Sequence, residues 1–102
     1  MEMKDKFTIK VYDFTKEIAV ESAIGEEINK KISKCLKEYN TVILDFINVK
    51  IVLTAFIKAT IKSFIDELGQ KVFSERIKII NLPTYSNDIL EKIFNVSVKK
   101  SY

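Results

Sequence analysis

The chain has 102 residues, of which 47% are hydrophobic and 30% are charged, and its formal net charge is +3. This length and balance are typical of one globular domain with a single core, and they exclude a disordered chain. No apolar run is long enough for a membrane span or for the core of a signal peptide, so we expect a cytoplasmic protein.

Several kinds of chemistry are excluded by the residues that the sequence lacks. It contains no histidine, and Cys35 is its only cysteine. An internal disulfide, a zinc site built from Cys and His, and Ser-His-Asp or Cys-His catalysis are therefore excluded. Gly25 and Gly69 are the only glycines, so no phosphate-binding glycine pattern exists. We expect no catalytic residue, no metal and no cofactor.

The basic residues give little support to nucleic-acid binding. Arg76 is the only arginine among the 17 basic residues, and the other 16 are lysine. Recognition of phosphates and base edges relies heavily on arginine. A sequence this rich in lysine and isoleucine is typical of AT-rich coding DNA. We therefore expect no nucleic-acid partner and no membrane partner.

The N-terminal residues predict strands followed by a helix. Phe7–Val11 alternates apolar and polar residues, which indicates a strand at or near a sheet edge. Tyr12–Phe14 either extends this strand or turns, and Ile18–Val20 is either a second short strand or a connector.

The next predicted element is a helix from Gly25 to Glu38. Acidic residues at 26 and 27 occupy its first turn and lysines at 34 and 37 its last, as the helix dipole favours. Cys35 lies on the apolar stripe and is expected to be a core residue rather than a nucleophile, because no activating base is present.

The stretch from Thr41 to Leu68 organises the chain. A buried strand over Val42–Phe46 is followed by a turn at Asn48 and a second apolar run, Val49–Leu53. From Thr54 onward the apolar residues fall at helical spacing. The pattern predicts a strand that leads through a loop to the N-terminus of an amphipathic helix, where α/β proteins tend to place functional groups.

After this helix we expect Gly69 to be a left-handed cap that stops it. Gln70–Ser74 then adds a further helical turn, with Val72 and Phe73 directed toward the core.

The remaining residues predict a strand, a helix and a brief final strand. The strand is Arg76–Leu82, and the third helix is Asp88–Phe94, capped at its start by Ser86 or Asn87. Val96–Val98 is expected to form the last strand.

The order of elements indicates the fold class. Strands that alternate with helices imply parallel pairing through right-handed crossovers, although the first strand could pair antiparallel. The prediction is one α/β domain over residues 1–102, with a mixed, mostly parallel β-sheet and helical crossovers.

Particular residues of this chain resemble a known family. The resemblance is carried by Leu44-Asp45-Phe46, Val49, Thr54-Ala55-Phe56 and Arg76–Leu82, and extends over Gly25–Phe94. These runs look like the STAS-like proteins of unknown function, which are small bacterial relatives of the STAS domain (sulfate transporter and anti-sigma factor antagonist).

The resemblance implies a function. In anti-sigma factor antagonists, the loop after the corresponding strand carries Asp-Ser-Ser, and a partner kinase phosphorylates the first serine. That serine falls on Thr54, while the aspartate falls on Leu53 and the second serine on Ala55. The acidic positions that often follow are Lys58 and Ala59 here. The resemblance thus implies a non-enzymatic regulatory module whose partner is a serine/threonine kinase with a histidine-kinase-type ATPase fold.

Two interpretations of Thr54 stay open. It is either a phosphoacceptor at a helix N-terminus, or an ordinary N-cap whose oxygen accepts an amide hydrogen bond. The partner-binding candidates around it are Asn48, Lys50, Ala55, Lys58 and Tyr85. A different class of function is a small-ligand or anion-binding sensory domain that uses the helix N-terminus.

Other polar and aromatic residues also have two interpretations. Asp45 is either a catalytic or magnesium-binding carboxylate, or a residue that closes the strand by bonding loop amides. Phe56 is either an exposed anchor or part of the core. Lys58 and Lys62 either form the rim of an interface or belong to a solvated helix face.

Overall fold

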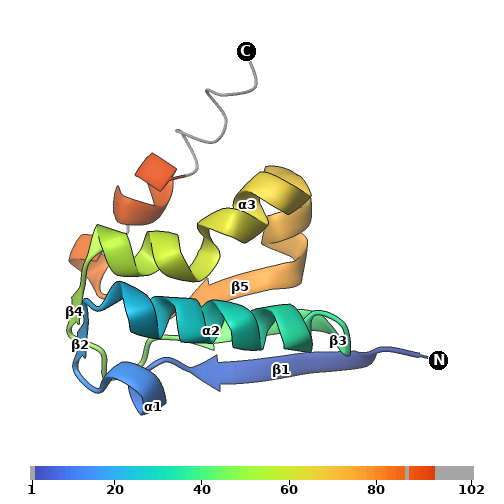
Figure 1. Ribbon diagram of the computed structural model, residues 1–102, viewed down its shortest axis with the longest axis horizontal. Coiled ribbons are helices and arrows are strands. Elements are labelled where there is room, and N and C mark those ends of the chain that lie inside the picture. The colour runs from blue at the N-terminus through green and yellow to red at the C-terminus, as the bar shows by residue number, and fades with distance from the viewer. Residues whose placement is uncertain (1, 87, 94–102) are drawn as a thin grey trace.

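A computed structural model of the protein describes residues 2–86 and 88–93 and shows an α/β fold (Figure 1). Its elements follow in the order β1 (Lys4–Lys10), α1 (Tyr12–Thr15), β2 (Ile18–Ala19), α2 (Ser22–Cys35), β3 (Tyr39–Asp45), β4 (Ile51–Val52), α3 (Thr54–Arg76), β5 (Ile77–Ile80) and a 3-10 helix (Thr84–Ser86), and residues 88–93 are helical.

The main sheet has three strands in the order β1-β3-β5, and both pairs are parallel. The register places Ile9 beside Leu44 and Leu44 beside Ile79, so their side chains share one face of the sheet. The predicted α/β fold with helical crossovers is confirmed. β1 lies at an edge, as expected, and it is parallel to β3 rather than antiparallel.

Helices α2 and α3 lie side by side and cover one face of this sheet (Figure 1). The strand residues on that face form the core with the apolar stripes of both helices, and Val42, Leu44 and Phe56 are fully buried. No helix among the described residues is both long and apolar enough to cross a membrane.

A second, two-stranded parallel sheet joins the N-terminal segment to the centre of the chain. Ile18 pairs with Ile51, and Ala19 pairs with Val52. Ala19 and Val52 are buried, whereas their neighbours Ile18 and Ile51 point outward. The segment after β1 does not extend the strand but forms the short helix α1, and Ile18–Ala19 is a strand rather than a connector.

The bounds predicted for α2 were wrong at both ends: Gly25 was interpreted as its start, and residues 36–38 form a turn rather than its last helical residues. The helix begins at Ser22 and ends at Cys35, so Glu26 and Glu27 lie beyond its first turn. Gly25 is instead required by packing: a Cβ atom there would lie 2.9 Å from the carbonyl oxygen of Phe56 in α3. The glycine lets the two helices approach closely.

Polar side chains complete this helix–helix contact. The amide nitrogen Nδ2 of Asn29 donates hydrogen bonds to the carbonyl oxygen of Thr60 and to Oγ of Ser63, both at 2.9 Å. Thr60 is fully buried, and its hydroxyl donates to the carbonyl oxygen of Phe56 at 2.8 Å. These hydrogen bonds fix how far α2 and α3 are shifted along each other, because each donor must face its acceptor.

Gly69 interrupts α3 and divides it into two helical segments. Its φ of 82° and ψ of 157° are not helical, yet the helix resumes and continues to Arg76. The residues after the kink form a second helical segment, in which Phe73 is buried, as predicted, and Val72 is exposed. The predicted stop at Gly69 and the further helical segment after it are confirmed, although a ψ of 157° is not that of a left-handed cap. The expectation of an inward Val72 was wrong, because the kink changes which residues of the following turn face the core.

The last strand is shorter than predicted, because Arg76 belongs to the helix. β5 covers Ile77–Ile80, and Asn81 follows with a positive φ of 59°. The guanidinium of Arg76 donates to three carbonyl oxygens between the end of α2 and the start of β3: Leu36 at 2.6 Å, Tyr39 at 3.1 Å and Asn40 at 2.7 Å.

Ser86 does not act as the predicted helix cap. It lies in the 3-10 helix, and its hydroxyl is buried without a hydrogen-bond partner in the described structure. The helical residues 88–93 agree with the predicted third helix. Asn87, Phe94 and the predicted strand Val96–Val98 lie outside the described residues.

The contact at Gly25 predicts the effect of a substitution. Alanine normally stabilises a helix by about 1 kcal/mol relative to glycine. We expect Gly25→Ala to do the opposite and lower the free energy of unfolding by about 1–3 kcal/mol, because the methyl group meets backbone. Urea denaturation measures this, with Ser33→Ala on the exposed face of α2 as a near-neutral control. A stabilised Gly25→Ala variant would contradict the close approach of the helices.

The hydrogen bonds of Arg76 predict a second effect. Arg76→Met leaves three carbonyls without this donor and is expected to lower the free energy of unfolding by about 1–3 kcal/mol. Arg76→Lys should recover little, because one ammonium cannot reproduce the planar geometry of the guanidinium. The exposed Lys71→Met is the matched control, and equal denaturation midpoints for Lys71→Met and Arg76→Met would contradict the role of this side chain.

Candidate functional site

Thr54 lies where β4 passes into α3. It is exposed, as predicted, and its hydroxyl makes no hydrogen bond to any described residue. The N-cap is Leu53, whose backbone is extended (φ −99°, ψ 152°) and whose side chain has no capping atom. The interpretation of Thr54 as the N-cap was therefore wrong by one residue, since Thr54 is the first residue of the helix.

A row of exposed apolar side chains leads up to Thr54. Ile18 is 52% exposed, Ile51 is 45% exposed and Leu53 is 50% exposed. Ile18 and Ile51 are register partners, and the amide of Leu53 donates to the carbonyl oxygen of Ala19 at 3.0 Å, which continues the pairing. The three side chains thus project from the same side of β2 and β4, and we call them the apolar row.

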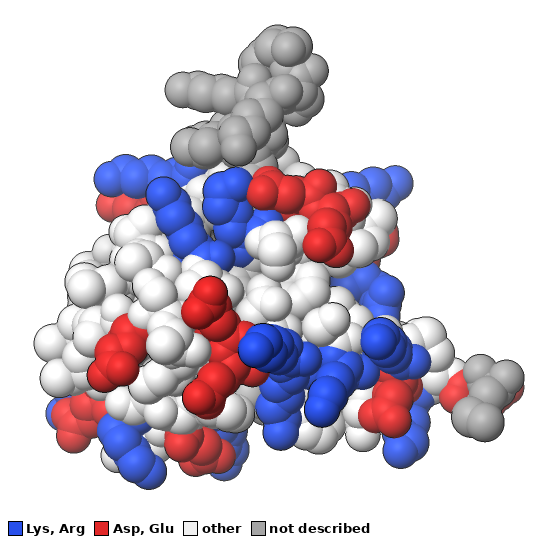
Figure 2. Space-filling view, in the orientation of Figure 1, with Lys and Arg blue, Asp and Glu red and all other residues white. Residues whose placement is uncertain are grey.

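The apolar row lies at an area of the surface with charges at its border. Figure 2 shows a white, uncharged area at the left of the view, on the side where β2 and β4 lie, with charged side chains beside and below it. Exposed apolar side chains that gather in one place mark interaction surfaces more often than scattered ones do. The row is therefore the best candidate for a contact surface near Thr54.

Sequence reasoning missed this row. Val49–Leu53 looked like one buried run, but only Val49 and Val52 are buried. The sequence carries no signal for it, because Ile51, Val52 and Leu53 are all apolar and only the structure shows which of them point outward. Ile18 was assigned to no functional site.

Two of the predicted partner-binding residues, Lys50 and Tyr85, lie together beside this row. The hydroxyl of Tyr85 donates a hydrogen bond to the carbonyl oxygen of Lys50. The side-chain ammonium of Lys50 lies 3.3 Å from the carboxylate of Glu17. The backbone amide of Lys50 also donates a hydrogen bond to the carbonyl oxygen of Glu17. Because Lys50 precedes Ile51 and Glu17 precedes Ile18, these contacts form one border of the apolar row.

The other predicted residues fall into two groups. Ala55 and Lys58 are exposed on the first turns of α3 with Thr54. Lys62, the second lysine of the predicted rim, instead bonds to Asp66 at 2.8 Å. Asn48 occupies an exposed turn with a φ of 71°, and no hydrogen bond in the described structure links it to Thr54.

Phe56 and Asp45 have structural roles. Phe56 is fully buried and belongs to the core, so it is not an exposed anchor. One carboxylate oxygen of Asp45 accepts hydrogen bonds from the amide of Ile47 and from the side chain of Asn81, both at 2.9 Å. Asp45 thus closes β3 and ties its end to the end of β5. Among the described residues, no group of three potential metal ligands exists.

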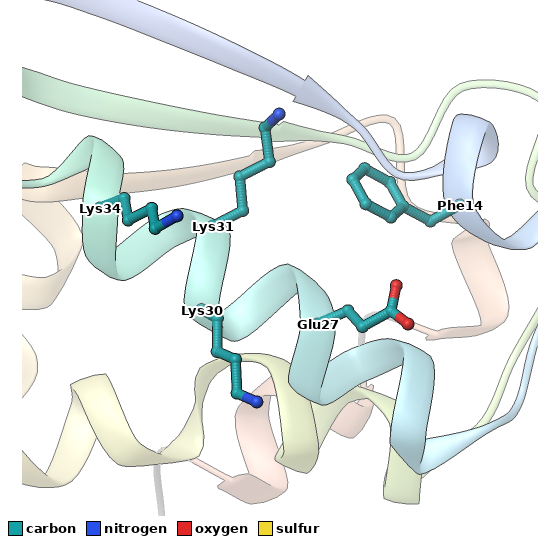
Figure 3. A pocket seen from close by; sticks show the side chains of 5 residues that line it. All are labelled: Phe14, Glu27, Lys30, Lys31 and Lys34. Atoms are coloured by element: carbon teal, nitrogen blue, oxygen red, sulfur yellow. The ribbon is translucent and has the colours of Figure 1, made fainter.

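A shallow hollow of about 330 Å³ lies beside α2, lined by Phe14, Glu27, Lys30, Lys31 and Lys34 (Figure 3). Its lysines suggest an anion site, but their amines do not converge. Lys30 and Lys31 point to opposite sides of α2, and the ammonium of Lys31 lies 5.7 Å from the ring centre of Phe7. The hollow is therefore a weaker candidate than the surface around Thr54.

Cys35 is buried on α2, as predicted. Its burial raises the pKa of the thiol; nearby Lys31 lowers it, and Glu38 raises it further. A raised pKa keeps the sulfur in the unreactive thiol form at neutral pH.

This predicts slow modification of Cys35. At pH 8, a thiol reagent is expected to react with the folded protein at least roughly tenfold more slowly than with the urea-unfolded chain, and the folded rate should rise as pH increases. The measurement is the release of the chromophore from a disulfide reagent in both states. Equal rates for the folded and unfolded protein would show that the thiol is accessible and normally acidic.

Fold and site together define a small parallel α/β domain with an exposed hydroxyl at a strand-to-helix junction. A model of the STAS-like domain of unknown function (DUF4325) matches residues 25–87. The chain belongs to this family, as the sequence predicted. No curated protein and no solved structure matches it. The match includes Ile51, Leu53 and Thr54, while Ile18 precedes it.

Proposed function

We propose that this protein is a non-enzymatic regulatory module that binds another protein through the apolar row and the first turn of α3. The observation that supports it is the position of Ile18, Ile51 and Leu53, about half exposed, beside the unbonded hydroxyl of Thr54. Burying these three side chains against a partner would remove apolar surface from water, which is the main driving force of protein association.

The proposed partner is a serine/threonine kinase with a histidine-kinase-type ATPase fold. This class comes from the STAS relationship, since anti-sigma factor antagonists bind such kinases. The structure adds a reason for contact at this place, because an apolar centre with a polar border is typical of interfaces. Lys50, Glu17 and Tyr85 supply that border, and Lys58 is exposed in α3, four residues after Thr54.

Thr54 is the proposed regulatory group in this surface. Phosphorylation would add a charge of about −1.5 to −2 beside the first N–H groups of α3, which tolerate negative charge. Lys58 lies one helical turn further on, where it would also favour a phosphate. The domain would remain folded, while the apolar row would gain a strongly hydrated neighbour that opposes burial.

The experiment is site-specific photo-crosslinking. A photo-reactive amino acid is placed at position 53 in the full chain, expressed in cells of the source organism, and the crosslinked protein is identified by mass spectrometry. The matched control carries the same group at position 30, on the exposed side of α2. We expect one protein to be captured from position 53 and not from position 30, and we expect that protein to have an ATPase-type kinase fold.

The captured protein then permits a quantitative test. We expect Leu53→Glu and Thr54→Asp each to weaken binding at least about tenfold, or roughly 1.4 kcal/mol, while Lys30→Glu changes it little. Isothermal titration calorimetry measures the affinities. Unchanged binding by Thr54→Asp would remove the switch, and unchanged binding by Leu53→Glu would remove the surface. A melting shift with nucleotides or inorganic anions, without any captured protein, would favour the ligand-binding alternative.

A further inference from the structure

The three-stranded sheet has a second face that no described helix covers. The pattern of alternation places on it Lys4, Lys6, Thr8 and Lys10 of β1, Tyr39, Thr41, Ile43 and Asp45 of β3, and Lys78 and Ile80 of β5. All of the β1 and β5 members of this set are exposed, and the β3 members are half-buried. We call this set the open face.

The open face is unusual for a parallel sheet. Parallel sheets in α/β proteins generally have both faces covered, usually by helices. Here α2 and α3 cover one face, and Ile43 and Ile80 on the other face are not part of the core. Ile80 is 42% exposed, and Ile43 lies at the centre of the sheet between its two neighbours. Ile43 has Thr8 and Lys78 as register partners, and Ile80 has Asp45. The two isoleucines are therefore diagonal neighbours, and this pair, which we call the strip, is left without a cover.

The charges beside this strip are mainly basic. Lys6 and Lys10 extend from β1 and make no ion pair with the described residues. Lys78 lies on β5, where its ammonium bonds to the carbonyl oxygen of Ser74 at 2.6 Å. Asp45 is the one acidic residue of the open face, and one of its oxygens already accepts two hydrogen bonds. Unpaired positive charge therefore borders the strip on the β1 side.

We propose that the open face binds an acidic amphipathic helix of a partner protein. The apolar stripe of the helix would cover Ile43 and Ile80, and its carboxylates would lie beside Lys6 and Lys10. A helix is the element that covers the other face of this sheet, and β1, with 7 residues, spans about 23 Å. A helix of about 15 residues has the same length.

Two other occupants fit these residues less well. A second copy of the chain would place its lysines against Lys6 and Lys10, and like charges oppose such an interface. Single-stranded nucleic acid binds to sheets by stacking its bases on aromatic side chains. The aromatic residue in the register of the open face, Tyr39, packs on Phe7 and the core, and the face contains no arginine.

A peptide selection tests the proposal without a known partner. A display library of random 16-residue peptides is selected on the full protein and counter-selected on the variant K6E/K10E. We expect the retained peptides to carry Asp and Glu beside apolar residues at helical spacing. Synthetic copies should bind with an affinity that K6E/K10E and Ile80→Ser each lower at least tenfold, as measured by fluorescence anisotropy.

The control variant K30E/K34E makes the same charge change on α2, on the opposite side of the sheet, and should change the affinity less than twofold. Circular dichroism verifies that every variant is folded.

Retained peptides without acidic residues, or with equal affinity for K6E/K10E, would overturn the proposal. A single-stranded oligonucleotide that binds more tightly than the peptides, or self-association that Ile80→Ser abolishes in sedimentation, would overturn it in favour of the corresponding occupant. Leu53→Glu should leave peptide binding unchanged, which separates this surface from the apolar row.

Discussion

The close approach of α2 and α3 at Gly25 determines where the candidate surface lies. Only a residue without a Cβ atom lets the two helices meet at the carbonyl oxygen of Phe56, and Asn29 fixes their relative position through Thr60 and Ser63. Because Phe56 is in the first turn of α3, this contact holds the start of that helix against α2. The helix that carries Thr54 at its first position is thereby placed relative to α2.

Most of the fold could be predicted from the sequence, because hydrophobic periodicity reports burial directly. The strand before Asp45, the helix after Thr54 and the parallel order of elements all came from such patterns. The ends of elements could not be predicted equally well. Gly25 was taken as a helix start, because a glycine that makes room for a neighbouring helix and one that lies at a helix end look the same in the sequence.

The sequence predicted where Thr54 lies in the fold, but it did not predict which exposed apolar residues surround it. Residue 54 emerges at a strand-to-helix junction, and Lys50 and Tyr85 are joined by a hydrogen bond that no sequence pattern reveals. The exposed Ile18 was missed, because its pairing with Ile51 brings together residues from two distant segments. Apolar residues in a one-dimensional pattern are read as buried, and only three-dimensional pairing shows which of them have no cover.

The contacts of Arg76 have a consequence for how the chain acquires its structure during synthesis. The carbonyls that it binds belong to residues 36, 39 and 40, which leave the ribosome long before residue 76 does. Until then, the residues between the end of α2 and the start of β3 lack the hydrogen bonds from Arg76, and β3 lacks its partner strand β5. A nascent chain that stops before this point can form local helices but not the closed sheet, so stable folding awaits the last third of the sequence.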